Sequence, residues 1–121
     1  MMYLFVAVGG ALGACLRFFL VNQTHVILGK EFAYGTLLVN VIGSFCIGAI
    51  YAYLQNSGMS ETLRALVVVG VLGSLTTFSA FSLDTVAFLQ TSQWLKAILN
   101  ISLNVTCCLA VTWLALHIFK G

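Results

Sequence analysis

Apolar residues fill most of this chain in four long runs, and short polar stretches separate the runs. A helix that crosses a membrane needs about 20 mainly apolar residues, and each run reaches that length. The pattern therefore predicts four spanning helices, at residues 3–22, 33–54, 61–90 and 94–119. Only short connections remain between them, so we expect one four-helix transmembrane domain over residues 1–121.

Composition points to the same class of protein. Hydrophobic residues make up 61% of the chain and charged residues 7%, whereas about 25% of the residues of a soluble domain are charged. The net charge is +2, and no basic run is present to bind nucleic acid. The first apolar run lacks a basic leading region and contains Arg17, so we interpret it as a retained helix rather than a signal peptide. We expect an all-α, multi-pass membrane protein.

The basic residues give the chain almost no preferred orientation in a membrane. Arg64 and Lys120 flank the side on which the N-terminus lies, while Lys30 and Lys96 flank the opposite side, to which Arg17 lies nearer. Because an excess of basic residues marks cytoplasmic loops, such a balance permits insertion in both directions. Opposite insertions can pair as an antiparallel dimer. The alternative is that a small protein simply carries few charges.

Glycine and hydroxyl residues interrupt the third apolar run at residues 70–82. Glycine weakens a helix, and Ser and Thr side chains can replace backbone partners, so we expect the third helix to be broken near its middle. Non-helical backbone at membrane depth is tolerated only where it is buried in protein or lines a watery cavity. Phe78 and Phe81 share a face just after the break, where their positive ring edges suit a weakly held anion. Ordinary packing is the competing interpretation.

Each of the other helices carries small or polar positions at four-residue spacing. Gly9 and Gly13 favour close helix packing. Arg17 either extends to the nearby membrane–water interface or attracts anions into a watery mouth. Asn40 either hydrogen-bonds a neighbouring helix or faces an ion. Polar faces on several helices are hard to bury in one monomer, so we expect an oligomer. The fourth helix has a polar line made of Lys96, Asn100, Asn104 and Cys108.

The cysteines and histidines indicate neither disulfides nor a metal site. Cys107 and Cys108 are adjacent, which disulfide geometry disfavours, and we expect these two, Cys15 and Cys46 to be small, buried and reduced. His25 and His117 are far apart in sequence and have no metal-ligand spacing. We find no nucleophile with a base and no pair of carboxylates, so we do not expect an enzyme.

Three motifs resemble the signatures of the Fluc/CrcB fluoride channels: GGALGACLRF from Gly9, GTLLVNVIGSF from Gly35 and GVLGSLTTFSAFS from Gly70. Their order and spacing fit over nearly the whole chain. The resemblance implies a fluoride-selective channel that exports fluoride passively from the cytoplasm and protects against its toxicity. It also implies an antiparallel dual-topology homodimer in the bacterial inner membrane, with two pores and a structural sodium ion (Na⁺) at the centre of the interface.

The resemblance also implies roles for individual residues. Gly73 and Thr76 would supply main-chain carbonyls to the sodium ion. Phe78 and Phe81 would be the aromatic rings of the pore, with Asn40 as the polar donor beside them. The remaining implied positions are Arg17 near the vestibule, and Ser79, Thr77 and Asn104 along the pore or the break.

The chain departs from the family pattern at two places, and two other classes of protein stay open. Position 80 is alanine where the family often has threonine, and the fourth helix has no tyrosine. A proton-coupled exporter like the small multidrug transporters needs a carboxylate deep in a helix, and Asp84 is the only acid well inside a predicted span. A non-transporting membrane assembly factor would need only the stripes of small residues.

Overall fold

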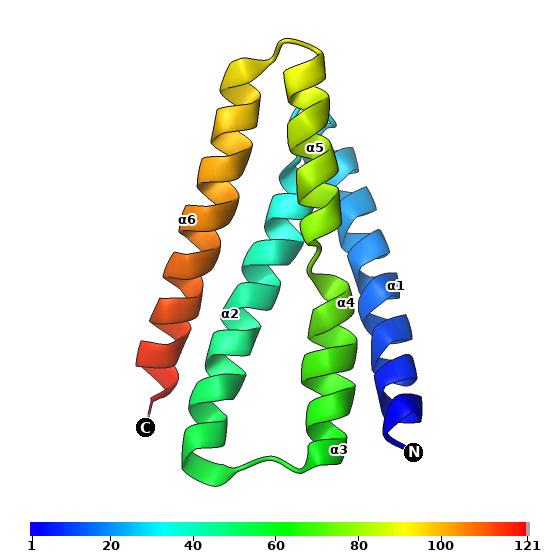
Figure 1. Ribbon diagram of the computed structural model, residues 1–121, viewed down its shortest axis with the longest axis vertical. Helices are drawn as coiled ribbons and strands as arrows, with labels where there is room; N and C mark the ends of the chain where they lie inside the picture. The colour runs from blue at the N-terminus through cyan, green and yellow to red at the C-terminus, as the bar shows by residue number, and fades with distance from the viewer. Residues whose placement is uncertain (121) are drawn as a thin grey trace.

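The computed structural model describes residues 1–120, apart from the side chains of residues 55–57, and its regular structure is entirely helical over that range. Four helical stretches are long and apolar enough to cross a membrane, so the prediction of an all-helical protein with four spans is confirmed. Three spans are the single helices α1 (Met2–Leu28), α2 (Tyr34–Ser57) and α6 (Trp94–Phe119). The third span consists of α3 (Glu61–Arg64), η1 (Ala65–Leu72), α4 (Gly73–Leu75) and α5 (Phe78–Gln90). Figure 1 shows both termini and the α2–α3 connection at one end.

Helix α1 continues past the predicted end at residue 22. The prediction stopped at polar residues, but the hydroxyl of Thr24 donates to the carbonyl of Leu20 at 2.7 Å, so this residue is satisfied within the helix. Gly29 ends the helix instead. Its φ of 86° lies in the left-handed region, which glycine adopts without steric cost.

The third span begins at Ser60, whose hydroxyl accepts a hydrogen bond from Leu63 N–H at 3.2 Å. The next segment, η1, is a π-helix, in which N–H groups donate to carbonyls five residues back. At its end, for example, Gly73 N–H donates to the carbonyl of Val68. The sequence did not predict this wider helix.

Between α4 and α5, two residues have extended backbone: Thr76, with φ −82° and ψ 153°, and Thr77, with φ −150° and ψ 115°. We refer to them as the Thr76–Thr77 linker. They lie within the segment that the sequence singled out for its glycines and hydroxyls. Thr76 N–H still donates to the carbonyl of Leu72 at 3.1 Å, but the helical hydrogen bonds stop there, so other groups must satisfy Thr77 N–H.

Glycines bring the backbones of α1 and η1 into direct contact. A Cβ atom added to Gly9 would lie 2.9 Å from the Cα of Gly70, and one added to Gly13 would lie 2.9 Å from the carbonyl carbon of Val71. Neither position has room for a side chain. The interpretation of these α1 glycines as packing positions is confirmed.

Helices α2 and α6 also approach closely. A Cβ atom at Gly48 would lie 2.6 Å from the carbonyl oxygen of Thr112, and the hydroxyl of Thr112 donates to the carbonyl of Ser44 at 2.9 Å. The buried centre of the helix packing is a small cluster made of Val39, Leu72 and Leu75.

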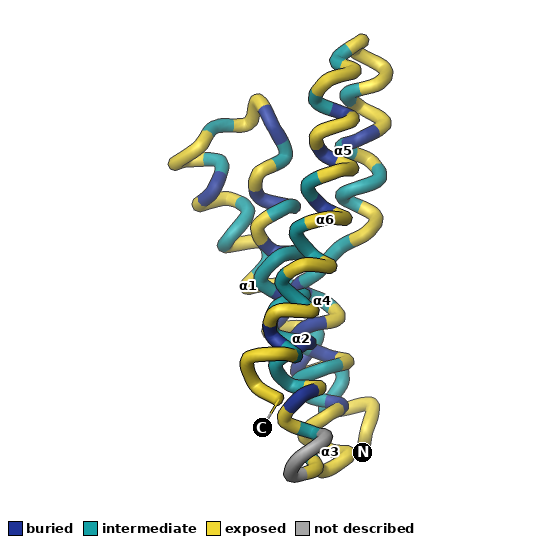
Figure 2. Tube along the Cα trace, turned by 90° about the vertical axis from the view of Figure 1, so that its left-hand side faces the viewer, coloured by how far each residue is buried: buried dark blue, intermediate teal, exposed yellow. Residues whose placement is uncertain are grey.

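Most of the remaining apolar surface faces outward. Figure 2 shows exposed positions along every span, with buried positions confined to the contacts between helices. Such a surface suits lipid, which solvates apolar side chains as well as a protein interior does. All four cysteines are free thiols, as predicted, but none is fully buried: Cys15 is exposed, and Cys46, Cys107 and Cys108 are half-buried, so the expectation of burial was wrong. Cys15 lies on the outward side of α1, which its apolar surroundings in the sequence did not reveal.

We expect Gly9→Ala to destabilise the helix bundle by about 1–3 kcal/mol, because the added methyl group meets backbone atoms that cannot move aside alone. Thermal unfolding in detergent measures the change. Ala11→Val is the matched control, since Ala11 is exposed on the same helix. Equal unfolding temperatures for Gly9→Ala and the unmodified protein would contradict the close packing of α1 on η1.

Candidate functional site

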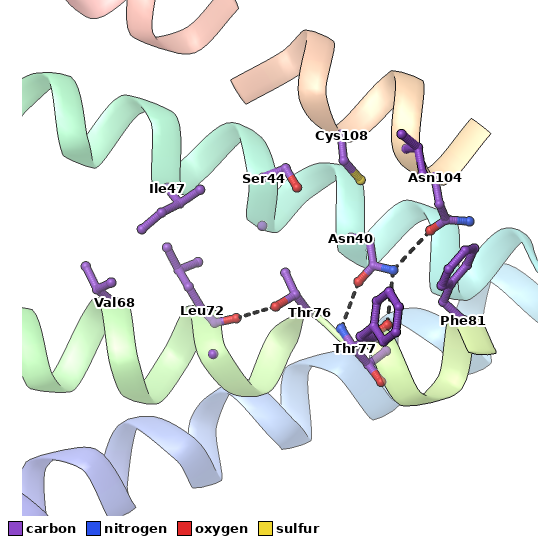
Figure 3. Close-up of a pocket in the computed structure, with 14 residues that line it drawn as sticks. Asn40, Ser44, Ile47, Val68, Leu72, Thr76, Thr77, Phe81, Asn104 and Cys108 are labelled. Atoms are coloured by element: carbon purple, nitrogen blue, oxygen red, sulfur yellow. Dashed lines mark hydrogen bonds between the residues drawn. The ribbon is translucent and has the colours of Figure 1, made fainter. Parts of the chain in front are cut away.

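A groove of about 430 Å³ lies beside the Thr76–Thr77 linker (Figure 3). It brings together every site residue that the sequence indicated except Ser79 and Arg17. Side chains of α2, the third span and α6 form its wall, so three spans contribute to one site. The polar and aromatic positions among its lining residues are Asn40, Ser44, Thr76, Thr77, Phe78, Phe81 and Asn104.

Asn40 satisfies both main-chain polar groups of Thr77. Its Oδ1 accepts from Thr77 N–H at 2.8 Å, and its Nδ2 donates to the Thr77 carbonyl at 3.2 Å. The same Nδ2 donates to Oδ1 of Asn104 at 3.0 Å, as Figure 3 shows. Asn40 was predicted either to hydrogen-bond a neighbouring helix or to face an ion. The structure shows the interhelical hydrogen bonds, and both Nδ2 hydrogens have acceptors.

This pairing redirects the hydrogen bonds at the end of α4. In a continuous helix Thr77 N–H would donate to the carbonyl of Gly73, but here it donates to Asn40. Likewise, Ala80 N–H would reach the carbonyl of Thr76, but it donates to Oγ1 of Thr77 at 3.1 Å. The carbonyls of Gly73 and Thr76 thus lack their helical donors. They stand at the negative end of one helix dipole, beside the positive N-terminus of α5.

The aromatic pair lies on the first turn of α5. The ring centroids of Phe78 and Phe81 are 5.4 Å apart, with 56° between the planes. Phe78 is 77% exposed, while Phe81 is half-buried and lies beside Asn104 in Figure 3. The two rings therefore border the groove next to the Asn40 amide.

Ser79 lies outside the groove but touches its edge. Its hydroxyl oxygen is 3.2 Å from Oγ1 of Thr77, and the side chain is exposed. Its contact with the groove runs through the Thr77 hydroxyl, which also caps the N-terminus of α5.

A buried set of hydrogen bonds extends from the groove along α5 and α6. Asn104 Nδ2 donates to the carbonyl of Asn100 at 2.9 Å and to its Oδ1 at 3.1 Å. Asn100 Nδ2 donates to Oγ1 of Thr85 at 2.9 Å, and that hydroxyl donates to the carbonyl of Phe81 at 2.8 Å. The sequence showed the four-residue spacing of the asparagines. It carried no signal that Thr85 faces Asn100, because that contact depends on how α5 packs against α6.

Arg17 lines a second cavity, of about 240 Å³, together with Thr36, Thr77 and Ala80. Its Nε is buried and has no hydrogen-bond partner among the described residues. Thr77 belongs to both cavities, so the linker connects them. Thr36 also donates from its hydroxyl to Oδ2 of Asp84 at 2.9 Å.

Four apolar spans, three of which line an uncharged groove beside non-helical backbone, define a multi-pass membrane protein with a site inside its spans. The chain matches, over residues 4–116, the family described as CrcB-like protein, Camphor Resistance (CrcB). It belongs to this family.

Several curated relatives are similar over nearly their whole length, and each of these three is named fluoride-specific ion channel FluC. The protein of Alteromonas mediterranea is 46% identical over 121 residues, which cover 99% of this chain and 95% of the relative. That of Aeromonas salmonicida is 48% identical over 117 residues, with coverages of 96% and 94%. That of Shewanella frigidimarina is 50% identical over 111 residues, with coverages of 92% and 90%.

We expect Asn40→Leu to destabilise the protein by about 1–3 kcal/mol for each buried polar group of Thr77 that it leaves unpaired. Ser44→Ala is the control, because Ser44 lines the same groove one helical turn away on α2. Thermal unfolding in detergent compares the two variants. If they unfold at the same temperature, the Asn40 amide does not stabilise the linker.

Proposed function

We propose that this chain is a fluoride-specific ion channel, as its relatives are named, and that it is not an enzyme. The observation that carries the proposal is the groove at the Thr76–Thr77 linker, where neutral amides, hydroxyls and two phenyl rings meet inside apolar spans. The proposed activity is passive export of fluoride from the cytoplasm across the bacterial inner membrane, driven by the electrochemical gradient. Export of this kind protects the cell against fluoride toxicity.

The chemistry of fluoride explains why such a groove suits it. A small anion gives up bound water only if donors replace that water, yet a channel must also release the ion quickly. The Asn40 amide, the hydroxyls of Thr76 and Thr77, and the positive edges of Phe78 and Phe81 are all neutral groups. Several weak contacts of this kind hold an anion without trapping it. Arg17, which lines the second cavity and has a buried Nε without a described partner, is proposed to attract anions to the vestibule.

We propose that the carbonyls of Gly73 and Thr76 hold a structural sodium ion. Both carbonyls lack their helical donors, because Asn40 and the Thr77 hydroxyl take the N–H groups that would pair with them. Carbonyl oxygens are the ligands that hard cations prefer. No cluster of three or more His, Cys, Asp or Glu side chains suited to a metal occurs within residues 1–120. A bound sodium ion would add positive potential near the path of the anion.

We further propose that two copies pair in opposite orientations, as an antiparallel dual-topology homodimer. Gly73 and Phe78 are exposed on the single chain although they line the groove at the linker, and a second copy would cover them. Two basic residues flank each end of the spans, with Arg17 as the fifth, and this near balance supports insertion in both directions. Two-fold pairing would bring the carbonyls of two linkers around one sodium ion.

A proton-coupled exporter is the second candidate, and one contact favours it. Asp84 is half-buried within the third span and accepts a hydrogen bond from Thr36. Such an exporter would lose proton-dependent transport in Asp84→Asn, whereas a passive fluoride channel shows no coupling to a proton gradient.

We expect Phe81→Ile to reduce fluoride efflux from reconstituted vesicles at least about tenfold, because the variant keeps an apolar side chain but loses the ring edge. A fluoride electrode records efflux after valinomycin is added. Valinomycin lets potassium ions leave the vesicles together with fluoride, so no opposing voltage builds up. Phe19→Ile is the matched control, since Phe19 is exposed on α1 and lies outside the groove. Fluoride efflux that is unchanged in Phe81→Ile would remove this ring from the pathway.

We expect sodium to raise the thermal unfolding temperature of the purified protein relative to an equal concentration of N-methylglucamine, which is too large for a carbonyl site. A ligand bound only by the folded state stabilises it by about 1.4 kcal/mol for each tenfold rise in concentration above its Kd. Both cations are added as chloride salts, so ionic strength is matched. Identical unfolding temperatures would argue against the sodium site.

A further inference from the structure

One directional series of hydrogen bonds connects the linker to the backbone of α5 by way of α2 and α6. We call it the amide chain. Every member donates to the next: Thr77 N–H to Asn40, Asn40 to Asn104, Asn104 to Asn100, Asn100 to Thr85, and Thr85 to the carbonyl of Phe81.

Main-chain groups at both ends fix the direction of the amide chain. Thr77 N–H can only donate, and the carbonyl of Phe81 can only accept. If one amide between them turned over, two donors or two acceptors would face each other. The orientation of the Asn40 amide is therefore set from both sides, by Thr77 and by Asn104.

Asn100 holds the middle of the amide chain. Its side chain is 0% exposed, and burying an amide is unfavourable unless its polar atoms are paired. Both are paired here, Oδ1 with Asn104 and Nδ2 with Thr85. Asn100 does not line the groove, so any effect that it has on an ion there acts either through Asn104 or through Thr85 and the backbone of Phe81.

We propose that Asn100 is a positioning residue for anion recognition, because it keeps Oδ1 of Asn104 pointed at Nδ2 of Asn40. This inference rests on the proposed fluoride channel. An anion that takes this Asn40 hydrogen must displace Asn104, so one hydrogen bond is exchanged for another and the net gain is small. Weak net binding allows the ion to leave. Without the Asn100 side chain, Asn104 Nδ2 keeps only main-chain carbonyl 100 as an acceptor. The Asn104 amide is then held less firmly against Asn40, and Asn40 holds the anion more tightly.

The test is single-channel recording in planar bilayers over a series of fluoride concentrations. Asn100→Leu removes the amide at similar volume, while Asn104 keeps main-chain carbonyl 100 as an acceptor. We expect the half-saturating fluoride concentration to fall roughly fivefold, as for the loss of one competing hydrogen bond, and the maximal unitary current to fall with it. A purely structural role would change the number of active channels but neither of these values.

A double-mutant cycle checks the route through Asn104. If Asn100 acts through that residue, adding Asn100→Leu to Asn104→Leu channels changes neither the half-saturating concentration nor the maximal current. Independent effects of the two substitutions would overturn the proposal. So would half-saturation of Asn100→Leu channels at the same fluoride concentration as the unmodified channel.

Thr85→Val keeps the test decisive if Asn100→Leu does not fold. It removes the acceptor of Asn100 Nδ2 at nearly constant volume, and we expect a shift in the same direction. An unchanged half-saturating concentration in Thr85→Val would then overturn the inference. Absence of fluoride current in the unmodified protein would instead overturn the proposed function, and this inference with it.

Discussion

The structure depends on one exchange of hydrogen bonds, in which the side chain of Asn40 replaces the helical acceptor of Thr77 N–H and also donates to the Thr77 carbonyl. An unpaired N–H or carbonyl in an apolar environment costs several kcal/mol, so two extended residues inside a spanning segment need such a substitute. An asparagine side chain provides one, because its amide carries the same donor and acceptor as a peptide group. The exchange leaves the carbonyl of Gly73 without its helical donor, and the Thr77 hydroxyl, which accepts from Ala80 N–H, does the same to the carbonyl of Thr76.

Glycines on two neighbouring helices hold the linker in place. The backbone of α1 lies directly against η1 at Gly9 and Gly13. On α2, a Cβ atom at Gly43 would collide with Cγ2 of Thr76. Since lipid competes equally well for apolar side chains, close backbone contact of this kind is a main source of attraction between spanning helices. The π-helical η1 precedes the linker, so the register of this span already differs from that of an α-helix before Thr76 is reached.

The groove is mainly apolar, and its few polar lining groups among the described residues carry no charge. Its polar lining consists of amides and hydroxyls, whereas Arg17 lines the neighbouring cavity and Asp84 is held by Thr36. A full charge in the groove would hold an anion strongly or exclude it, depending on its sign. Neutral dipoles avoid both outcomes, which fits the proposed passive channel. Outside the groove, Asn100 and Thr85 are also neutral, and their hydrogen bond satisfies a buried amide without adding charge.

The sequence by itself determined the four spans, because apolar runs of spanning length have few alternatives. It also located the linker segment by its glycines and hydroxyls, and it marked Asn40 and the two phenylalanines as unusual for a spanning helix. Tertiary structure alone decided that Asn40 binds the backbone of Thr77, that Thr85 meets Asn100, and that Arg17 lies in a separate cavity. The reason is that lipid-facing and helix-facing surfaces are both apolar. The hydrophobic pattern that shows which face of a soluble helix is buried therefore gives almost no information here. Partners far apart in sequence are selected by helix packing.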